Sequence, residues 1–310
     1  MRTFVLLAAS LCALGCATPH ARTAAAPSLE NVQSVAIPEY GSERGIEWTG
    51  SREDYVAAQT DQRFVLEQFT YQSDGLTVGA YLYRPRVRPA HRLPVIVFNR
   101  GSITWPHGFV GQILIPLHRY AEAGYIVVAP QYRGSNGWQG RDEAGGADLH
   151  DLMNIVPQIG RIPGADPTHL YLAGESRGGA MVFMALRDGF PARAAAEWGG
   201  FTDLGPLIAE GGPQARYAPM LWPDLDQRRE EVVSSRSVMF WADKINAPVL
   251  IMHGGADEDI PAEQSRQLDA ELTRLGKVHQ FLVFDGEQHV IGGKGAERDA
   301  AVVAWFRRFQ

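Results

Sequence analysis

Ser176 has the sequence neighbours of a catalytic nucleophile. It is the centre of Gly-Glu-Ser-Arg-Gly at 174–178, which follows an apolar run at 169–173 and precedes an amphipathic stretch at 179–188. A sharp turn from a strand into a helix would push the serine hydroxyl outward, and the flanking glycines would relieve crowding. The backbone N–H of Arg177 would then face an oxyanion. The alternative interpretation is a glycine-rich turn without chemistry.

A serine hydroxyl is a poor nucleophile unless a base accepts its proton and a carboxylate orients that base. For a turn of this kind the expected chain order is serine, acid, histidine. Only His253, His279 and His289 follow Ser176 in the chain. His289 comes just after the apolar run at 280–284, where a strand would end, so we predict that it is the base.

The orienting carboxylate is predicted to be Asp257, in the loop after the apolar run at 249–252. Glu258 and Asp259 are the alternatives. Active sites of open α/β sheets gather at the carboxyl ends of the strands. We therefore expect the serine, the acid and the histidine to meet at that edge.

The remaining histidines have simpler interpretations. His253 is expected to pack and form hydrogen bonds within its own loop. His279 precedes its strand, which places it at the opposite edge of the sheet, in solvent. His107 and His118 come before the serine and fit the expected order poorly, although His107 is a candidate for lining a pocket.

A second oxyanion donor is expected in the loop after the apolar run at 94–98, which begins Asn99-Arg100-Gly101. The backbone N–H groups near Arg100 and Gly101 are the candidates, and the side-chain amide of Asn99 is a further one. The alternative is that Asn99 only caps the turn.

Three arginines are predicted near the same edge, namely Arg100, Arg133 and Arg177. A guanidinium group can hold a carboxylate or phosphate of a substrate in a bidentate manner. The alternative is that they form ion pairs with neighbouring acidic residues: Asp142, Glu143 and Glu175.

Alternating strands and helices are predicted to position these residues. The expected strands are short β-rich or apolar runs at 64–71, 76–83, 94–98, 125–129, 169–173, 194–198, 249–252 and 280–284. The expected helices are amphipathic stretches at 113–123, 148–159, 179–188, 262–275 and 297–309. This order predicts an α/β fold in which helices cover both faces of a mostly parallel sheet. A turn signal at 73–75 makes the first two strands a hairpin, and 64–310 reads as one catalytic domain.

The interval 201–244, after the sixth predicted strand, is rich in glycine, proline and aromatic residues. A stretch of this length without a strand indicates a lid or insertion. Its aromatic residues Tyr217, Trp222 and Trp241 are candidate pocket walls, with core packing as the alternative.

The first sixteen residues are predicted to be a signal peptide. A positive start at Arg2 precedes an apolar run that ends Ala-Leu-Gly-Cys at 13–16, which is too short for a permanent membrane helix. This ending is similar to a bacterial lipobox, so Cys16 is the predicted lipidation site of an exported, membrane-anchored lipoprotein. Plain secretion is the alternative. Residues 17–63 are expected to be a tether and a loosely structured lead-in.

Composition excludes several classes of protein. Hydrophobic residues at 45% and charged residues at 21% are globular values, and a net charge of −6 argues against a nucleic-acid partner. Two cysteines rule out a disulfide scaffold or Cys-rich zinc module. We expect no metal and no cofactor. The expected partner is a small-molecule or short-peptide substrate, with membrane contact through the lipid only, and the oligomeric state stays open.

Taken together, these features resemble the α/β-hydrolase superfamily and, within it, the catalytic domain of the prolyl oligopeptidase group of serine peptidases. The matching segments are 71–75, 131–135, 145–148, 174–179 and 247–261. The resemblance implies Ser176 as nucleophile, Asp257 as acid and His289 as base. Two features depart from the group. The short lead-in leaves no room for the β-propeller that usually precedes this domain, and the oxyanion loop lacks the usual His-Gly-Gly or Tyr-Gly-Gly.

The expected function is therefore hydrolysis of an ester or amide through an acyl-enzyme on Ser176. A peptidase acting on short peptides is favoured, with a carboxylesterase as the first alternative. A non-catalytic binding lipoprotein is the alternative from another class, because a fold does not fix a function.

Overall fold

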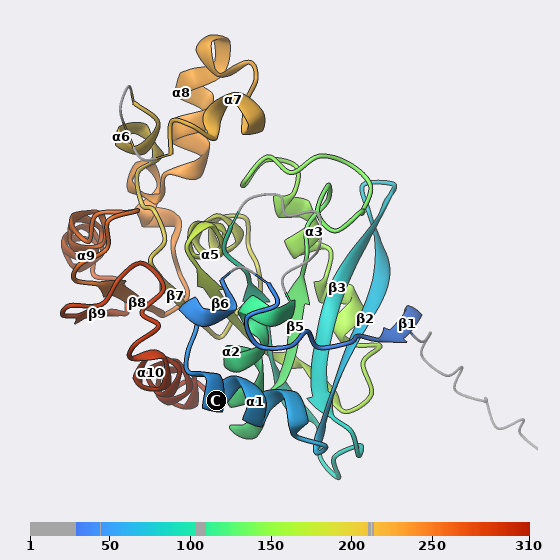
Figure 1. The fold of residues 1–310 in the computed structure, drawn as a ribbon. Coiled ribbons are helices and arrows are strands. Elements are labelled where there is room, and N and C mark those ends of the chain that lie inside the picture. Colours follow the sequence, from blue (N-terminus) through green and yellow to red (C-terminus); the bar gives the residue numbers. More distant parts are fainter. Residues whose placement is uncertain (1–28, 44, 103–109, 210–211, 213) are drawn as a thin grey trace, which may run out of the picture.

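A computed structural model describes residues 29–43, 45–102, 110–209, 212 and 214–310. Their strands are β1 (Glu30–Ser34), β2 (Phe64–Ser73), β3 (Leu76–Pro85), β4 (Leu93–Asn99), β5 (Ile126–Pro130), β6 (Ala165–Glu175), β7 (Ala194–Trp198), β8 (Val249–Gly254) and β9 (His279–Phe284). They form one sheet in the order β1-β2-β3-β5-β4-β6-β7-β8-β9 (Figure 1).

The sheet is parallel from β5 through β4, β6, β7 and β8 to β9, and antiparallel where β1, β2 and β3 join it. Strands β5, β7 and β8 are buried along their whole length. Strands covered on both faces are apolar throughout, which is why these runs could be found in the sequence. The predicted hairpin is also present: Asp74 and Gly75, between β2 and β3, have φ values of +52° and +77°, as a tight two-residue turn requires.

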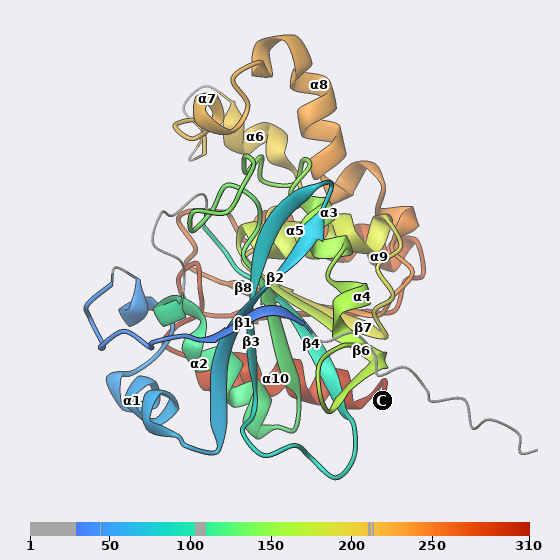
Figure 2. The same ribbon diagram turned by 90° about the vertical axis from the view of Figure 1, so that its right-hand side faces the viewer.

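Helices cover both faces of the sheet, which confirms the predicted α/β-hydrolase fold. They are α1 (Arg52–Thr60), α2 (Val110–Glu122), α3 (Leu149–Met153), α4 (Val156–Ile159), α5 (Arg177–Arg187), α6 (Leu204–Ile208), α7 (Ala218–Leu221), α8 (Leu225–Arg236), α9 (Glu263–Arg274) and α10 (Gly295–Arg307). Figure 2 shows α1 and α2 on one side of the sheet and α3, α4 and α9 on the other. Each face has its own hydrophobic core, and α10 contributes to the one that contains α2.

The interval 201–244 lies between β7 and β8 and contains the helices α6, α7 and α8, which project beyond the body of the domain (Figure 1). Two side chains attach it to the loop before α3. The indole Nε1 of Trp222 donates to the carbonyl of Glu143 (2.9 Å), and Nε of Arg236 donates to that of Ala144 (3.1 Å). The segment is therefore fixed to the domain by specific hydrogen bonds.

The prediction of a loosely structured lead-in is wrong for residues 29–63. Strand β1 extends the sheet through backbone hydrogen bonds although all its side chains are exposed, so it has no apolar pattern to detect. Helix α1 begins at a cap in which Oγ of Ser51 accepts from the N–H of Asp54 (3.1 Å). It buries only Tyr55 and Ala58, too few residues to show a period. The predicted signal peptide and Cys16 lie outside the described residues.

None of the helices that the structure describes is both long and apolar enough to cross a membrane.

Candidate active site

Ser176 lies at the turn between β6 and α5, where the backbone takes an unusual conformation. Its φ is +54° and its ψ is −124°, a combination that costs a non-glycine residue free energy. A Cβ at Gly174 would lie 2.3 Å from the carbonyl oxygen of Gly178, and one at Gly178 would lie 2.1 Å from that of Asn99. Only glycine fits on either side. The N–H of Ser176 donates to the carbonyl of Trp198 (2.8 Å), which holds the turn against β7.

His289 brings its imidazole to the serine from the loop after β9. Its Nε2 is 2.7 Å from Oγ of Ser176, and its Nδ1 is 2.8 Å from Oδ2 of Asp257. Because an ionised carboxylate can only accept, Nδ1 carries the hydrogen and Nε2 accepts from the serine hydroxyl. Arg298 on α10 supports this loop, since its Nη1 donates to the carbonyl of Val290 (2.6 Å).

Asp257 is held by several donors in the loop after β8. Its Oδ1 accepts from the backbone N–H groups of Asp259 and Ile260, both at 2.9 Å, while its Oδ2 faces His289 and His253. Burial alone would raise the pKa of Asp257, but hydrogen bonds from the two histidines and the backbone outweigh burial and hold it well below its ordinary value. The carboxylate therefore stays ionised at neutral pH.

The structure also shows which of the three candidate acids faces the base. Asp257 contacts His289, whereas Glu258 and Asp259 are exposed. Burial would lower the pKa of His289, but its hydrogen bond to Asp257 and the charges of Asp257, Asp259 and Glu175 together raise it above its ordinary value. The imidazole is thus a stronger base than a free histidine.

Both segments predicted to supply oxyanion donors border the nucleophile. Arg177 is the first residue of α5, so its N–H has no acceptor within the helix. Gly101, after β4, lies directly against Ser176: a Cβ at Gly101 would be 3.2 Å from the Cβ of the serine. Backbone donors in this loop and at the helix start therefore flank the hydroxyl.

The side-chain amide of Asn99 is not directed at this site, so that prediction is wrong. Its Nδ2 donates to the carbonyl of Ala173 (3.0 Å), and its Oδ1 accepts from the hydroxyl of Tyr132 (3.0 Å). Asn99 is fully buried, and both ends of its amide have partners. It joins the end of β4 to β6 and to the loop after β5, which is a structural role but differs from the turn cap of the alternative interpretation.

The guanidinium groups of Arg100 and Arg177 are buried and bind the protein, which corrects their prediction as substrate ligands. Arg177 contacts Asp142 and Asp148, at 2.7 Å and 2.5 Å. Arg100 donates to the carbonyl of Gln131 (2.8 Å) and to other acceptors in its surroundings. A buried cation requires such partners.

Of the three acidic residues predicted as partners, Asp142 contacts Arg177. Its second partner is Asp148, which was not predicted. Arg133 similarly contacts Asp151 (2.7 Å) and Asp74 (2.8 Å). The sequence identified the arginines, but not which of many acidic residues the loops would bring to them.

One part of the site was missed by sequence reasoning. Glu175, the neighbour of the serine, accepts a hydrogen bond from Nε1 of Trp198 (3.2 Å), and burial raises the pKa of Glu175. The guanidinium of Arg298 lies 4.6 Å from the ring centre of Trp198, as in a cation–π contact. Arg298 therefore supports the surroundings of the nucleophile as well as the His289 loop. A fully buried arginine in a helix carries no sequence signal.

Two of the remaining candidate histidines, His253 and His279, make contacts within the protein. His253 is buried and forms hydrogen bonds at the end of β8, as predicted. His279 begins β9 at the opposite edge, but it contacts Asp269 (3.0 Å) and is partly buried, so its predicted solvation is wrong. His107 lies outside the described residues.

Two of the candidate aromatic walls are packing residues. Trp222 and Trp241 are buried, and their indole N–H groups donate to the carbonyls of Glu143 and Ser234, both at 2.9 Å. Tyr217 is only partly buried and packs against the same core. The alternative interpretation, core packing, therefore describes all three.

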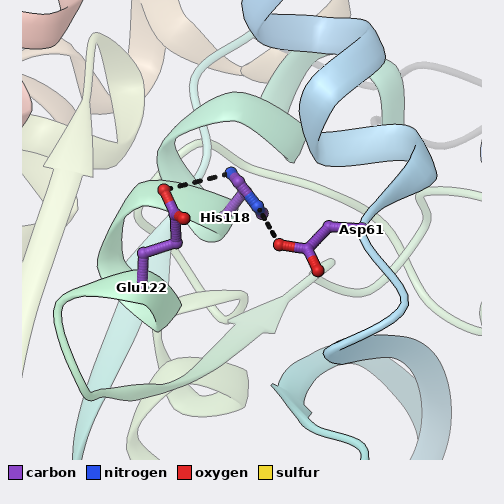
Figure 3. A group of neighbouring side chains, drawn as sticks. All are labelled: Asp61, His118 and Glu122. Carbon is purple, nitrogen blue, oxygen red and sulfur yellow. Dashed lines mark hydrogen bonds and ion pairs between the residues drawn. The ribbon is translucent and has the colours of Figure 1, made fainter.

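Asp61, His118 and Glu122 form the one group of described residues whose ligand atoms are close enough to share a metal ion (Figure 3). However, the two ring nitrogens of His118 face different carboxylates, with Nε2 3.0 Å from Asp61 and Nδ1 3.7 Å from Glu122. Arg63 also contacts both carboxylates at 2.6 Å. Both carboxylates thus already have a cationic partner, and the cluster joins the end of α1 to α2.

The geometry at Ser176 suits acyl transfer. A hydroxyl that donates to an imidazole can transfer its proton to that ring while it attacks a carbonyl carbon. The carboxylate on the far side of the ring stabilises the imidazolium that forms.

Comparison with known proteins agrees with the family resemblance found in the sequence. The model of the prolyl oligopeptidase family matches residues 116–309. The uncharacterized peptidase YtmA of Bacillus subtilis is 28% identical over 219 residues, which cover 70% of this chain and 82% of that protein.

Two solved structures share the fold. The acylaminoacyl peptidase of Pyrococcus horikoshii superposes with a TM-score of 0.65 at 24% identity, and a puromycin-hydrolyzing peptidase of Mycobacterium tuberculosis with 0.67 at 22%. They cover 82% and 81% of this chain, but the chain spans only 43% and 40% of theirs. The family match covers more than half of the chain and includes all three residues of the Ser–His–Asp arrangement. The chain therefore belongs to the prolyl oligopeptidase family and is a serine hydrolase of the peptidase type.

Proposed function

We propose that the protein is a serine peptidase that cleaves short peptides through an acyl-enzyme on Ser176. The observation that carries the proposal is the unbroken chain of hydrogen bonds from Ser176 to His289 and on to Asp257, at 2.7 and 2.8 Å. Membership of a peptidase family supports an amide rather than an ester as the natural substrate.

In the proposed reaction, Oγ of Ser176 attacks the carbonyl carbon of the substrate as its proton passes to Nε2 of His289. The imidazolium, stabilised by Asp257, then gives that proton to the leaving amine, and the C–N bond breaks. Water attacks the resulting ester with His289 again acting as base, which releases the acid and restores the serine. The N–H of Arg177 and an N–H of the loop at Gly101 stabilise the oxyanion in both steps.

The test is a paired assay of the full chain and its Ser176→Ala variant on p-nitrophenyl esters, aminoacyl amides, N-acylated aminoacyl amides, short peptides and puromycin. A fluorophosphonate probe reports the reactivity of the serine directly. The matched control is Ser234→Ala, on α8. We expect amide cleavage and labelling in the wild type and the control, and neither in Ser176→Ala.

The other outcomes are decisive against parts of the proposal. Turnover of esters without cleavage of any amide would make the protein a carboxylesterase. Activity that survives Ser176→Ala would mean that the nucleophile is a different residue. A wild type that is neither labelled nor active would favour a binding protein.

We also propose that the protein is exported and attached to a membrane of the bacterial cell envelope through lipid on Cys16. The proposal rests on the short apolar run and the Ala-Leu-Gly-Cys ending at 13–16. Cys16→Ala should move the protein from the membrane fraction to the soluble fraction, with Cys12→Ala as the matched control. Equal membrane retention of the two variants would refute the lipid anchor.

A further inference from the structure

A second histidine contacts the carboxylate of the Ser–His–Asp arrangement. His253 lies near the end of β8 and is fully buried. Its Nε2 is 3.1 Å from Oδ2 of Asp257, the same oxygen that faces His289. We infer that His253 is a positioning residue that fixes the carboxylate of Asp257 against His289. The inference rests on the proposed function, because it gives His253 a role in that reaction.

The contacts of His253 show which of its ring nitrogens carries the hydrogen. Its Nε2 also lies 2.9 Å from the carbonyl oxygen of Ile260, which can only accept, so Nε2 carries a hydrogen that it shares between this oxygen and Asp257. Its Nδ1 is 2.7 Å from Oγ of Ser265 on α9. When Nδ1 accepts from this hydroxyl, the ring is held in the tautomer that points a hydrogen at Asp257.

The geometry of the carboxylate explains why this fourth donor matters. Oδ1 of Asp257 is held by the backbone N–H groups of Asp259 and Ile260. These two bonds leave Oδ2 free to move about Oδ1, and the position of Oδ2 determines the hydrogen bond to His289. His253 contacts Oδ2 at 3.1 Å and so holds the oxygen that faces His289. It therefore orients the carboxylate that orients His289, much as hydrogen-bond partners orient the side chains that bind a metal.

His253 also connects three elements that must stay in register. Through Asp257 and Ile260 it joins the end of β8 to the loop at 257–260, and through Ser265 it joins both to α9. The charged groups near this ring are Asp257 itself and Glu197 on β7. Those near His289 are Asp257, Asp259 and Glu175. No other part of the site needs to change for His253 to act.

The experiment compares full-chain variants at position 253 by ester hydrolysis, amide hydrolysis and the rate of fluorophosphonate labelling, each across pH. His253→Phe removes the donor and keeps a ring, while His253→Gln keeps an N–H donor near the position of Nε2. The matched control is His279→Phe, because His279 also contacts an aspartate but at the opposite edge of the sheet. Circular dichroism establishes that each variant is folded.

We expect His253→Phe to lower kcat about 10- to 100-fold, as loss of a hydrogen-bond partner of a metal-ligating side chain does, with little change in KM. The acid limb of its pH–rate profile should move to lower pH, because a misplaced carboxylate stabilises the imidazolium of His289 less well. His253→Gln should recover most of kcat and of the wild-type profile, and His279→Phe should change neither. A role of His253 in folding alone would lower stability without moving the acid limb.

A folded His253→Phe with wild-type kcat and an unmoved acid limb would overturn the inference. If that variant does not fold, Ser265→Ala decides, because it removes the partner of Nδ1 and so lets the ring rotate away from Oδ2 of Asp257 without removing it. Ser265→Ala should then lower kcat and move the acid limb to lower pH, as expected for His253→Phe. Wild-type values of both would overturn the inference. Failure of the proposed peptidase function is recognised separately: a wild type that cleaves esters but no amides still allows the comparison at position 253.

Discussion

Glu197 is a buried acid beneath the nucleophile turn, and it should make the stability of the protein depend on pH. It lies on β7, fully buried, where one carboxyl oxygen accepts the N–H of Gly200 (3.0 Å). Its other oxygen has no hydrogen-bond partner among the described residues. Burial raises the pKa of Glu197 to about 8, although the nearby His253 opposes the increase.

The sign of the effect follows from the two pKa values. In the unfolded chain a glutamate has a pKa of about 4.3, so between pH 4.3 and 8 folding takes up a proton. The contribution of Glu197 to stability is fully present below about pH 4.3 and is lost as the pH rises toward 8. At about 1.36 kcal/mol per pH unit, this loss amounts to about 3 kcal/mol between pH 5 and pH 7.5.

Glu197→Gln keeps the shape of the side chain but does not titrate, so it should be free of this loss. The free energy of unfolding is measured by urea denaturation at pH 5 and pH 7.5 for the wild type and the variant. Relative to the wild type, the free energy of unfolding of the variant should rise by about 3 kcal/mol between pH 5 and pH 7.5. Any constant cost of the amide cancels in that comparison.

An exposed acid provides the control, since Glu230→Gln on α8 removes the same charge without removing a buried group. Its difference from the wild type should be nearly the same at both pH values. If the difference for Glu197→Gln is also the same at both, Glu197 does not titrate in this range and the reasoning from burial is wrong. A difference that moves in favour of the wild type would place its folded pKa below the unfolded one.

Three further predictions concern the site itself. In the wild type, kcat/KM should fall as the pH drops through the pKa of His289, and because Asp257 raises that pKa the midpoint should lie above 6.5; a midpoint below 6.5 would contradict the geometry. Asn99→Ala should lower stability by about 1–3 kcal/mol, because it leaves buried partners unpaired. Its loss in kcat should be far smaller than the roughly 10²–10³-fold expected on removing an oxyanion donor. Urea denaturation and ester kinetics separate the two roles. Gly178→Ala should reduce kcat and the melting temperature together, because its Cβ would meet the carbonyl of Asn99 at 2.1 Å; a fully active, stable variant would show that the turn can relax.

The sequence was sufficient to predict eight of the nine described strands, β2 to β9, and the Ser–His–Asp arrangement, for a physical reason. Buried parallel strands are apolar along their whole length, so each one shows where a loop at the carboxyl edge begins. The chain order then leaves few candidates for each role. Ser176, Asp257 and His289 each follow a recognisable strand, and their meeting at 2.7 and 2.8 Å depends on the sheet rather than on any contact nearby in the sequence.

Other features could not be predicted, because the same residues are compatible with more than one set of contacts. The amide of Asn99 can cap a turn or face a substrate, and only the loop geometry decides. Strand β1 is polar and exposed, and it belongs to the sheet through backbone hydrogen bonds alone. Arg298 lies in a helix with several charged residues, of which it and Asp299 are buried, and Arg298 donates to the His289 loop.

Buried arginines explain how loops can hold a precise site at the edge of a sheet. Loop carbonyls lack the partners that a strand or helix supplies, and a buried carbonyl without a partner is costly. One guanidinium has five donors in a fixed plane. Arg100 uses them on the carbonyls of Gly101, Ser102 and Gln131, and Arg298 uses one on the loop of the base.

The composition fits this use, because only three of the 29 basic residues are lysines. A lysine is a flexible point charge that cannot satisfy several carbonyls in one plane. Replacing Arg100 by lysine should therefore not preserve the site, although the charge is kept. The arginines that resemble substrate ligands in the sequence are bound to the loops instead, so the proposed reaction relies on backbone N–H groups and on Ser176, His289 and Asp257.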